Sequence, residues 1–453
     1  MTRKILHAAD IHLDSPLQKL GTYENAPVDR IRGASRRALE NMVKLAIDQS
    51  VDLVVIAGDL YDGDWPDQNT GLFFVAQANK LVKAGIPLVV IRGNHDAANL
   101  MTSSLPLPRN PDGSEIMMRA DKVDLRRFDS IGVAVHGRSF RTRAETENLA
   151  ADYPLPIAGM FNLGLLHTSL TGAEGHDPYA PCTPAMLSDK HYDYWALGHI
   201  HQRGEHGLAD AAPVVFSGNI QGRHIREAGQ RGCVLVEIDS SGSCQRVFHP
   251  LDVVRWQMCT IDVSRMSHTD DVIEEFQSWV VQQAASAQHR LLVVRVELVG
   301  ASALHSELHR QHNNLQAALR ATCVAHGGDQ AWLESLRVKT SALANPAIDQ
   351  LQLEGPMESL HAVIEELKSD PQLAAVIEDE LRSLTKKLPD ELLGVDAAID
   401  VHDPASLRAL VESAAAEIQG RLHMTETHRQ ASQGPLDLRH LDPPGFDGVE
   451  VPQ

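Results

Sequence analysis

Short apolar runs alternate with amphipathic stretches along the first 250 residues. Each run ends in polar residues or glycine, and some are rich in β-branched residues, as in residues 51–57 (VDLVVIA). This pattern is typical of buried strands. We therefore expect strands at residues 5–9, 51–57, 86–91, 131–135, 161–166, 194–197, 213–216 and 233–238.

Helical patterns lie between the first three of these runs. Ala38 and Met42 belong to one amphipathic stretch, and Phe74 and Ala78 belong to the next. The order strand–helix–strand–helix–strand predicts βαβ units and an α/β fold. The later runs follow one another more closely, so we expect the second half of the sheet to be more antiparallel.

The pattern changes near residue 250. Residues 260–340 predict a small α/β unit, with helices at 270–287 and 306–323 and a strand at 291–299. Apolar stripes over residues 345–423 predict helices that either pack within their own domain or dock on a partner. The last residues are rich in Pro, Gly, Gln and Asp and predict a mobile tail. The expected domains are residues 1–250, 251–345, 346–425 and 426–453.

Composition limits the compartment and the partners. The chain has 453 residues, and its 43% hydrophobic content is enough for real cores. The formal net charge of −19 disfavours bulk attraction to nucleic acid or to an anionic membrane, so a polyanion must meet a local basic patch or a bound cation. Five cysteines without a C-x-x-C pair predict a reducing cytoplasm, and we expect neither a signal peptide nor a membrane span.

Chemically versatile side chains follow five of the predicted strands directly. They are Asp10 and His12 after the first strand, Asp59 after the second, Asn94, His95 and Asp96 after the third, His167 after residues 161–166, and His199 and His201 after residues 194–197. In open α/β sheets, ligands bind at the carboxyl ends of the strands. We therefore expect residues nearly 200 positions apart to converge on one site.

Local spacing supports a shared site. The D-x-H of residues 10–12 and the H-x-H of residues 199–201 each place two side chains on the same side of an extended segment. Gly58, Gly93 and Gly198 precede members of the set, and glycine permits tight turns and close backbone approach.

The set consists of aspartate, histidine and asparagine and includes no thiolate. Oxygen and imidazole ligands suit Mn²⁺, Fe²⁺ or Zn²⁺ better than Cu⁺ or an iron–sulfur cluster. Seven ligands are too many for one ordinary ion, but they fit two divalent cations that share a carboxylate. Two cations about 3.5–4 Å apart bind a phosphate group and activate water, which predicts hydrolysis of a phosphoester.

The ordered set resembles the motifs of the calcineurin-like metallophosphoesterase superfamily. The pattern D-x-H, G-D, G-N-H-[DE], H and G-H-x-H occurs in full and in order within residues 1–250. Residues 6–16 (LHAADIHLDSP), 161–169 (FNLGLLHTS) and 217–224 (SGNIQGRH) are similar to SbcD-type DNA repair exonucleases, above all to their bacterial YhaO-like branch. The resemblance implies a β-sandwich flanked by helices, a small α/β cap domain and a C-terminal helical region.

The resemblance also implies a role for each motif residue. One cation would be bound by Asp10, His12 and His201 and a second by Asn94, His167 and His199, with Asp59 bridging them. Mn²⁺ is the favoured ion, with Fe²⁺, Zn²⁺ and Mg²⁺ as alternatives. His95 matches the family histidine that acts near the scissile phosphate as an acid or transition-state stabiliser. Asp96 either hydrogen-bonds and orients His95 or caps a turn.

Two basic clusters are candidates for contacts with the DNA backbone. They are Arg30, Arg32, Arg36 and Arg37 before the first long helix, and Arg223, His224 and Arg226 after residues 213–216. A phosphate contact and an ordinary solvated surface both account for such clusters. Some family nucleases carry histidine where this chain has Asp62, and Gly63 replaces the arginine of Ser/Thr protein phosphatases, which disfavours a phosphoprotein substrate.

Partners and activity follow from the same resemblance. SbcD-type proteins act with an SMC-like coiled-coil ATPase and commonly dimerise, so the helices at residues 356–423 are the candidate docking element. The leading hypothesis is a two-metal DNA exonuclease or endonuclease that acts in DNA repair. A phosphodiesterase or phosphatase for a small nucleotide or other phosphoester is the alternative, which the long C-terminal extension disfavours. A non-enzymatic scaffold for an ATPase complex is a third hypothesis, and the complete ligand set disfavours it.

Overall fold

The computed structural model of the protein describes residues 2–15, 27–62, 68–97, 106–170, 179–209 and 211–343. These residues divide into two compact units. Unit 1 takes its residues from 1–261, 273–297 and 316–337, and unit 2 from 262–272, 298–315 and 338–343. The helices predicted within residues 346–425 and the tail predicted at 426–453 lie outside the described residues.

The first sheet of unit 1 has the strand order β11–β10–β1–β2–β3. Its strands are β1 (Arg3–Ala8), β2 (Leu53–Ala57), β3 (Leu88–Ile91), β10 (Gly232–Ile238) and β11 (Cys244–Pro250). β1, β2 and β3 pair in parallel, whereas β10 pairs antiparallel with both β1 and β11. The connections contain the helices α1 (Val28–Arg32), α2 (Ala34–Asp48) and α3 (Gln68–Lys83), which confirms the predicted βαβ order.

The second sheet of unit 1 has the order β4–β5–β6–β7–β9–β8. Its strands are β4 (Asp124–Phe128), β5 (Val133–Gly137), β6 (Phe161–His167), β7 (Tyr194–Gly198), β8 (Gly204–Glu205) and β9 (Val214–Phe216). The expected antiparallel arrangement is right for β10 and β11 but wrong for β5, β6, β7 and β9, which pair in parallel. Connections such as residues 138–160 are long enough for the crossover that parallel pairing requires.

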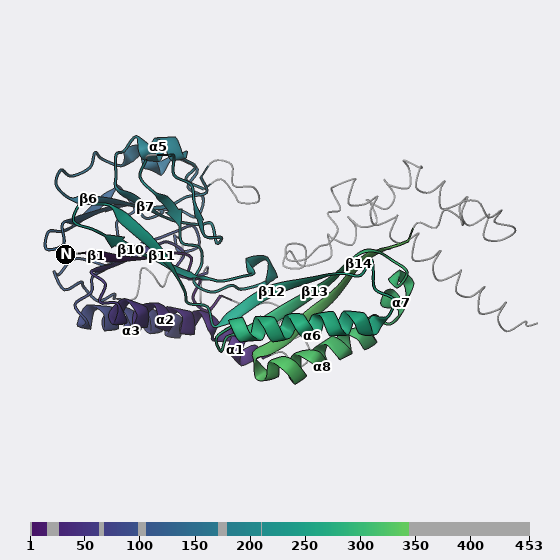
Figure 1. Ribbon diagram of the computed structural model, residues 1–453. Coiled ribbons are helices and arrows are strands. Elements are labelled where there is room, and N and C mark those ends of the chain that lie inside the picture. The colour runs from purple at the N-terminus through teal and green to yellow at the C-terminus, as the bar shows by residue number, and fades with distance from the viewer. Residues whose placement is uncertain are drawn as a thin grey trace, which may run out of the picture. The chain divides into compact units, whose positions relative to one another are not determined.

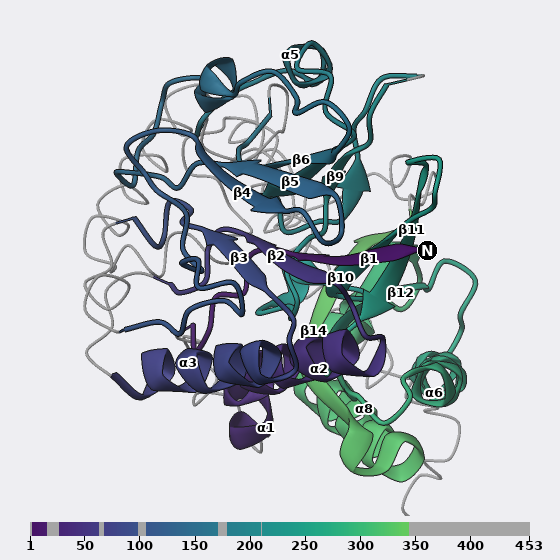
Figure 2. The ribbon, with the colours of Figure 1, turned by 90° about the vertical axis from the view of Figure 1, so that its left-hand side faces the viewer.

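The two sheets lie face to face, with α2 and α3 outside the first and α5 (Pro184–Ser188) outside the second (Figure 2). Val55 of β2 packs between the sheets with Leu165, whereas its neighbour Val54 packs towards the helices with Met42. Successive side chains of a strand point to opposite faces, so β2 is buried on both sides. This arrangement confirms the predicted α/β fold class and fixes the strand ends that carry the candidate ligands.

A third sheet has the order β12–β13–β14. Its elements are β12 (Val254–Asp262), α6 (Thr269–Ser286), β13 (Leu291–Ser302), α7 (His305–Arg310), α8 (His312–Gly327) and β14 (Ala331–Ala342). Within unit 1, α6 and α8 lie along one face of this sheet (Figure 1). The helix predicted at 270–287 and the strand at 291–299 are confirmed, but the helix predicted at 306–323 is divided at Gln311.

Short 3-10 helices complete the elements of the described residues. They are η2 (Leu149–Asp152), η3 (Ile225–Glu227) and η4 (Gly328–Gln330). In unit 2, the His305 Nδ1 atom lies 2.8 Å from the Thr340 Oγ1 atom and ties α7 to the end of β14. No helix among the described residues is long and apolar enough to cross a membrane.

Candidate metal centre

The predicted ligands follow the carboxyl ends of parallel strands in both sheets of unit 1. β1 ends at Ala8 and β2 at Ala57, and the next residues lead to the first three ligands. The Asp10 N–H donates to the Gly58 carbonyl at 3.0 Å, and the His12 N–H donates to the Asp59 carbonyl at 3.0 Å. These hydrogen bonds hold the two loops side by side beyond the end of the sheet.

The backbone of these loops is not extended, which corrects the reasoning from alternation. The φ angles are +50° at Asp10, +43° at His12, +49° at Asp59 and +101° at His199. Positive φ is uncommon for residues with a Cβ atom and persists only where surrounding structure enforces it. The ligand side chains therefore converge through left-handed turns rather than through the pleat of a strand.

Glycine is required at the positions that the sequence singled out. A Cβ atom on Gly93 would lie 2.3 Å from Asp59 Oδ1, and one on Gly198 would lie 1.9 Å from the Ala57 carbonyl oxygen. Gly58 has a φ of +93°, and a Cβ there would lie 2.4 Å from His167 Nδ1. The close backbone approach expected from the sequence is thus confirmed.

Asp10, His12 and His201 form the first group of potential ligands. One ligand atom from each lies within 4.8 Å of those of the others. The Nε2 atoms of His12 and His201 face each other at 3.1 Å. Both oxygens of Asp10 accept the His199 N–H, at 3.0 and 3.1 Å, which fixes the carboxylate.

Asp59, His167 and His199 form the second group, with the same spacing limit of 4.8 Å. His167 Nε2 lies 2.9 Å from Asn94 Oδ1 and 3.4 Å from Asp59 Oδ2. Asp59 Oδ2 also lies 3.8 Å from Nε2 of His12 in the first group. Asp59 therefore stands between the two groups, and all seven predicted ligands meet in one region of unit 1.

The donor chemistry of this region fits a cation. His167 Nδ1 lies 2.9 Å from the Ala57 carbonyl oxygen, which only accepts, so Nδ1 carries the hydrogen. In the neutral ring, the Nε2 lone pair then faces the oxygens of Asn94 and Asp59. A proton on Nε2 or a cation between these atoms removes the repulsion among the three acceptors.

The electrostatics of the buried residues agree with this geometry. Burial works against a charged ring, but the Asp59 carboxylate raises the pKa of His167 to about 9. Burial likewise favours a neutral Asp59, yet its contacts with His167 and His12 lower the pKa of its carboxyl below the usual range. Burial raises the pKa of Asp10. The centre therefore stabilises positive charge next to Asp59.

His95 lies beside the ligand groups and is paired with Asp62. Its Nδ1 atom is 2.7 Å from Asp62 Oδ1, and this pairing raises the pKa of His95 despite partial burial. The His95 side chain is 40% exposed, so the ring is accessible from solvent. The Asp96 carboxylate accepts the N–H groups of Leu60 and Tyr61 at 2.9 Å each and that of Gly93 at 3.3 Å, so it ties its own turn to the loop after Asp59. A role in orienting His95 stays a prediction.

Arg223 of the second basic cluster lies at this centre. Its Nη1 donates to Asp62 Oδ2 at 3.2 Å and its Nη2 to Glu227 Oε1 at 3.2 Å. The His224 Nε2 atom lies 3.7 Å from the same Glu227 oxygen, and Arg226 is exposed. The sequence missed Glu227, because a single acid beyond the last motif carries no distinguishing pattern.

In the first basic cluster, Arg36 and Arg30 pair with nearby acidic residues. Arg36 donates from Nε to Asp14 Oδ1 at 2.8 Å, and its guanidinium lies 5.0 Å from the Phe73 ring centroid. Arg36 is thus paired with Asp14, and its contact with DNA phosphate stays a prediction. Arg32 and Arg37 are exposed, and Arg30 pairs with Asp329.

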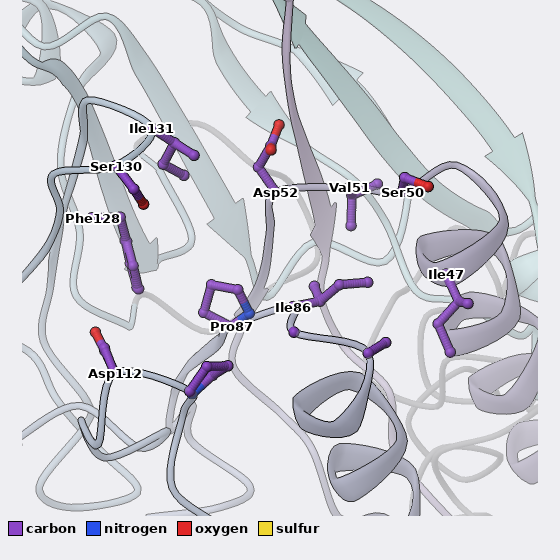
Figure 3. A pocket seen from close by; sticks show the side chains of 13 residues that line it. Ile47, Ser50, Val51, Asp52, Ile86, Pro87, Asp112, Phe128, Ser130 and Ile131 are labelled. Carbon is purple, nitrogen blue, oxygen red and sulfur yellow. The ribbon is translucent and has the colours of Figure 1, made fainter.

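A separate cavity of about 570 Å³ opens at the amino ends of β2 and β3 (Figure 3). Its lining includes Asp52, which precedes β2, and Pro87, which precedes β3. Because the candidate ligands follow the carboxyl ends of these strands, the cavity is distinct from the metal centre.

Comparisons with known proteins identify two regions of the chain. Residues 3–203 match the family described as calcineurin-like phosphoesterase, and residues 256–341 match that described as metallophosphoesterase YhaO, middle domain. An uncharacterized metallophosphoesterase YhaO from Bacillus subtilis is 34% identical over 259 residues, which cover 57% of this chain and 63% of the relative.

More distant relatives extend the comparison. A DNA double-strand break repair protein Mre11 from Methanopyrus kandleri is 26% identical over 287 residues, 58% of this chain and 59% of the relative. The chain thus matches about three fifths of the length of these two curated relatives. A solved dimetal phosphatase from Danio rerio aligns over 52% of this chain and 93% of its own at 11% identity, with a TM-score of 0.32.

Proposed function

Because this chain belongs to the calcineurin-like metallophosphoesterase superfamily, we propose that it is a metal-dependent nuclease that hydrolyses phosphodiester bonds of DNA during repair. The observation that carries the hydrolytic part is the convergence of acceptor atoms from His167, Asn94 and Asp59. The relative named as a DNA double-strand break repair protein supports DNA as the substrate, at 26% identity.

Two divalent cations, with Mn²⁺ favoured, are the proposed cofactors. The first would be held by Asp10, His12 and His201 and the second by Asn94, His167 and His199, with Asp59 shared. When bound, such cations supply Lewis acidity that neutralises phosphate charge and lowers the pKa of a water nucleophile. The protein contributes the fixed positions of the ligands, which the buried hydrogen bonds of Asp10 and His167 maintain.

His95 is the proposed proton donor to the leaving oxygen. Asp62 holds its Nδ1 atom at 2.7 Å, which leaves the other ring nitrogen to face a substrate. Burial works against a charged ring, but the hydrogen bond to Asp62 raises the pKa of His95, which favours the protonated form that an acid requires. General acid catalysis of this kind contributes about 10²–10⁴-fold in rate.

Arg223 is the proposed contact to the DNA phosphate next to the cleaved bond. Arg223 and His95 both pair with the Asp62 carboxylate, and the Arg223 side chain is 20% exposed. Its guanidinium is held by Asp62 and Glu227 and stays partly exposed, so it can meet a phosphate oxygen without leaving these partners. Arg226 and His224 would extend the contact along the backbone, which carries no base sequence information.

The partner proposals rest on the resemblance alone. An SMC-like coiled-coil ATPase is the proposed partner, and the helices predicted within residues 346–425 are the proposed docking element. Such a partner would also supply basic surface for DNA, which a chain of net charge −19 needs. A homodimer of the nuclease domain is proposed on the same ground.

A nuclease assay on linear duplex, hairpin and single-stranded DNA tests the proposed function. We expect cleavage with Mn²⁺, its loss with a chelator and its return when Mn²⁺ is added back. His95→Gln should abolish cleavage and keep the metal content, and His268→Gln, at an exposed position, serves as the matched control.

Other outcomes would reject the proposal. Full cleavage by His95→Gln would remove His95 from the reaction. Hydrolysis of cyclic nucleotides or bis(p-nitrophenyl) phosphate without any cleavage of DNA would establish the small-phosphoester alternative. A purified chain that binds no Mn²⁺ would support the scaffold hypothesis instead.

A further inference from the structure

Glu227 lies beside the metal centre at the end of the short helix η3 and has no role in the motifs described above. Its side chain is 7% exposed, and its Oε1 atom lies 2.7 Å from Nδ1 of His201. We propose that Glu227 is a positioning residue that orients His201 towards the first cation. This inference rests on the proposed metal centre but does not depend on which phosphoester is hydrolysed.

The hydrogen bond to Glu227 determines which His201 nitrogen faces the centre. A carboxylate only accepts, so Nδ1 of His201 carries the hydrogen and the lone pair of the neutral ring is on Nε2. That atom faces Nε2 of His12 at 3.1 Å. Arg223 Nη2 also approaches Nδ1 at 3.3 Å, but it donates to Glu227 Oε1 at 3.2 Å.

The Glu227 carboxylate is itself held firmly. Its Oε2 atom accepts the Arg223 backbone N–H at 2.7 Å and the Asn219 amide at 2.9 Å. These bonds, together with the two on Oε1, occupy the lone pairs of both oxygens and compensate for the burial of the charge. A carboxylate fixed on both oxygens holds the imidazole in one orientation, whereas a free side chain would allow the ring to turn.

The same loop also holds the backbone of His201. The Arg231 Nε atom donates to the Glu227 carbonyl at 3.1 Å, and Arg231 Nη1 donates to the His201 carbonyl. The side chain and the backbone of His201 are therefore both fixed by the segment from residue 219 to 231. This double attachment is what a positioning role requires.

The start of β12 anchors this segment. The Trp256 indole N–H donates to the Gly222 carbonyl at 3.0 Å. A Cβ atom on Gly222 would lie 2.7 Å from the Glu227 carbonyl oxygen and 3.2 Å from Trp256 Cδ1, so no side chain fits between them. The packing leaves the Glu227 loop little freedom to relax if the carboxylate is lost.

Removal of such a carboxylate partner from a metal-binding histidine typically weakens metal affinity about 10–100-fold. We expect a loss of this size in Glu227→Ala at the cation bound by Asp10, His12 and His201. The cation bound by Asn94, His167 and His199 should keep its affinity, because His167 is oriented by the Ala57 carbonyl instead. Glu227→Gln should lose less, since its amide oxygen still accepts the Nδ1 hydrogen of His201.

Calorimetric titration with Mn²⁺, alongside thermal unfolding of each variant, tests this proposal. The matched control is Glu334→Gln, which removes the charge from another buried carboxylate, paired with Arg295 at 2.6 Å. We expect one weakened and one unchanged Mn²⁺ site in Glu227→Ala, an intermediate loss in Glu227→Gln, and two unchanged sites in Glu334→Gln. Wild-type affinity at both sites in Glu227→Ala, or equal loss at both, would overturn the proposal.

The experiment separates this inference from the proposed function. A wild-type chain that binds two Mn²⁺ ions and cleaves no DNA would reject the nuclease while leaving the role of Glu227 testable by affinity. A nuclease whose Glu227→Ala variant binds both ions normally would reject the positioning role alone.

Discussion

Gly93→Ala tests whether the crowding at Asp59 is needed for the metal centre. The added Cβ atom would lie 2.3 Å from Asp59 Oδ1 and 2.8 Å from His167 Nε2, whereas ordinary contacts begin near 3.4 Å. The carboxylate must therefore move by 3.4 − 2.3 = 1.1 Å, or the loop must shift by a similar amount. The φ angle of Gly93 lies outside the left-handed region, so steric crowding and not backbone strain is the perturbation.

A displacement of about 1 Å in a catalytic constellation costs on the order of 10²-fold in rate. We expect Gly93→Ala to lose about this much hydrolysis and to bind Mn²⁺ more weakly. The assay is hydrolysis of DNA and of bis(p-nitrophenyl) phosphate at saturating Mn²⁺, with a Mn²⁺ titration in parallel. Overpacking should also lower the free energy of unfolding by about 1–3 kcal/mol.

Gly113→Ala controls for the stability loss. Gly113 has a φ of +81° and no atom within 4 Å of its Cβ position, so alanine there brings backbone strain without a clash. A left-handed alanine costs about 1–2 kcal/mol, and hydrolysis should remain at the wild-type level. Wild-type Mn²⁺ affinity and turnover in Gly93→Ala would refute the reasoning from crowding.

Three further predictions concern the neighbouring carboxylates and a buried histidine. Asp62→Asn should lower turnover on DNA by about 10²-fold, and much less on a p-nitrophenyl ester, whose good leaving group needs no proton from His95. Asp96→Ala should instead cost about 1–3 kcal/mol of unfolding free energy for each backbone N–H left unpaired, which urea denaturation measures. Burial lowers the pKa of His7 to about 3, so protons bind the unfolded state preferentially. The contribution of His7 to stability should be intact above pH 6.5 and fall by about 1.4 kcal/mol per unit as pH drops from 6.5 towards 3. His7→Gln should lack this component, so the difference in unfolding free energy between wild type and variant should itself fall by about 1.4 kcal/mol per pH unit over this range. A difference that does not change with pH would contradict the assignment.

The convergence of the ligands was predictable because it follows from chain topology. Parallel strands deliver their carboxyl ends to one edge of a sheet, so the residues after β1, β2 and β3 had to be neighbours. Glycines after buried strands also predicted crowding. A Cβ atom on Gly93 would lie 2.3 Å from Asp59 Oδ1, and one on Gly198 would lie 1.9 Å from the Ala57 carbonyl oxygen.

Other features left no comparable signal. β4 (DLRRF) and β11 (CQRVFHP) are edge strands whose mixed polar sequences lack the continuous apolar pattern of central strands. The left-handed turns at Asp10 and His12 depend on hydrogen bonds to a loop nearly 50 residues away. Glu227 is placed at the centre by its tertiary contact to His201, 26 residues away, and no periodicity encodes such a contact.

The most direct measurement is a crystal structure of the chain soaked in Mn²⁺, with anomalous scattering recorded for manganese. The account predicts two anomalous peaks in unit 1. One should lie among Asp10, His12 and His201, and the other among Asn94, His167 and His199. Asp59 should contact both. Crystals that diffract well and show no manganese among these side chains, or a single ion away from Asp59, would contradict it.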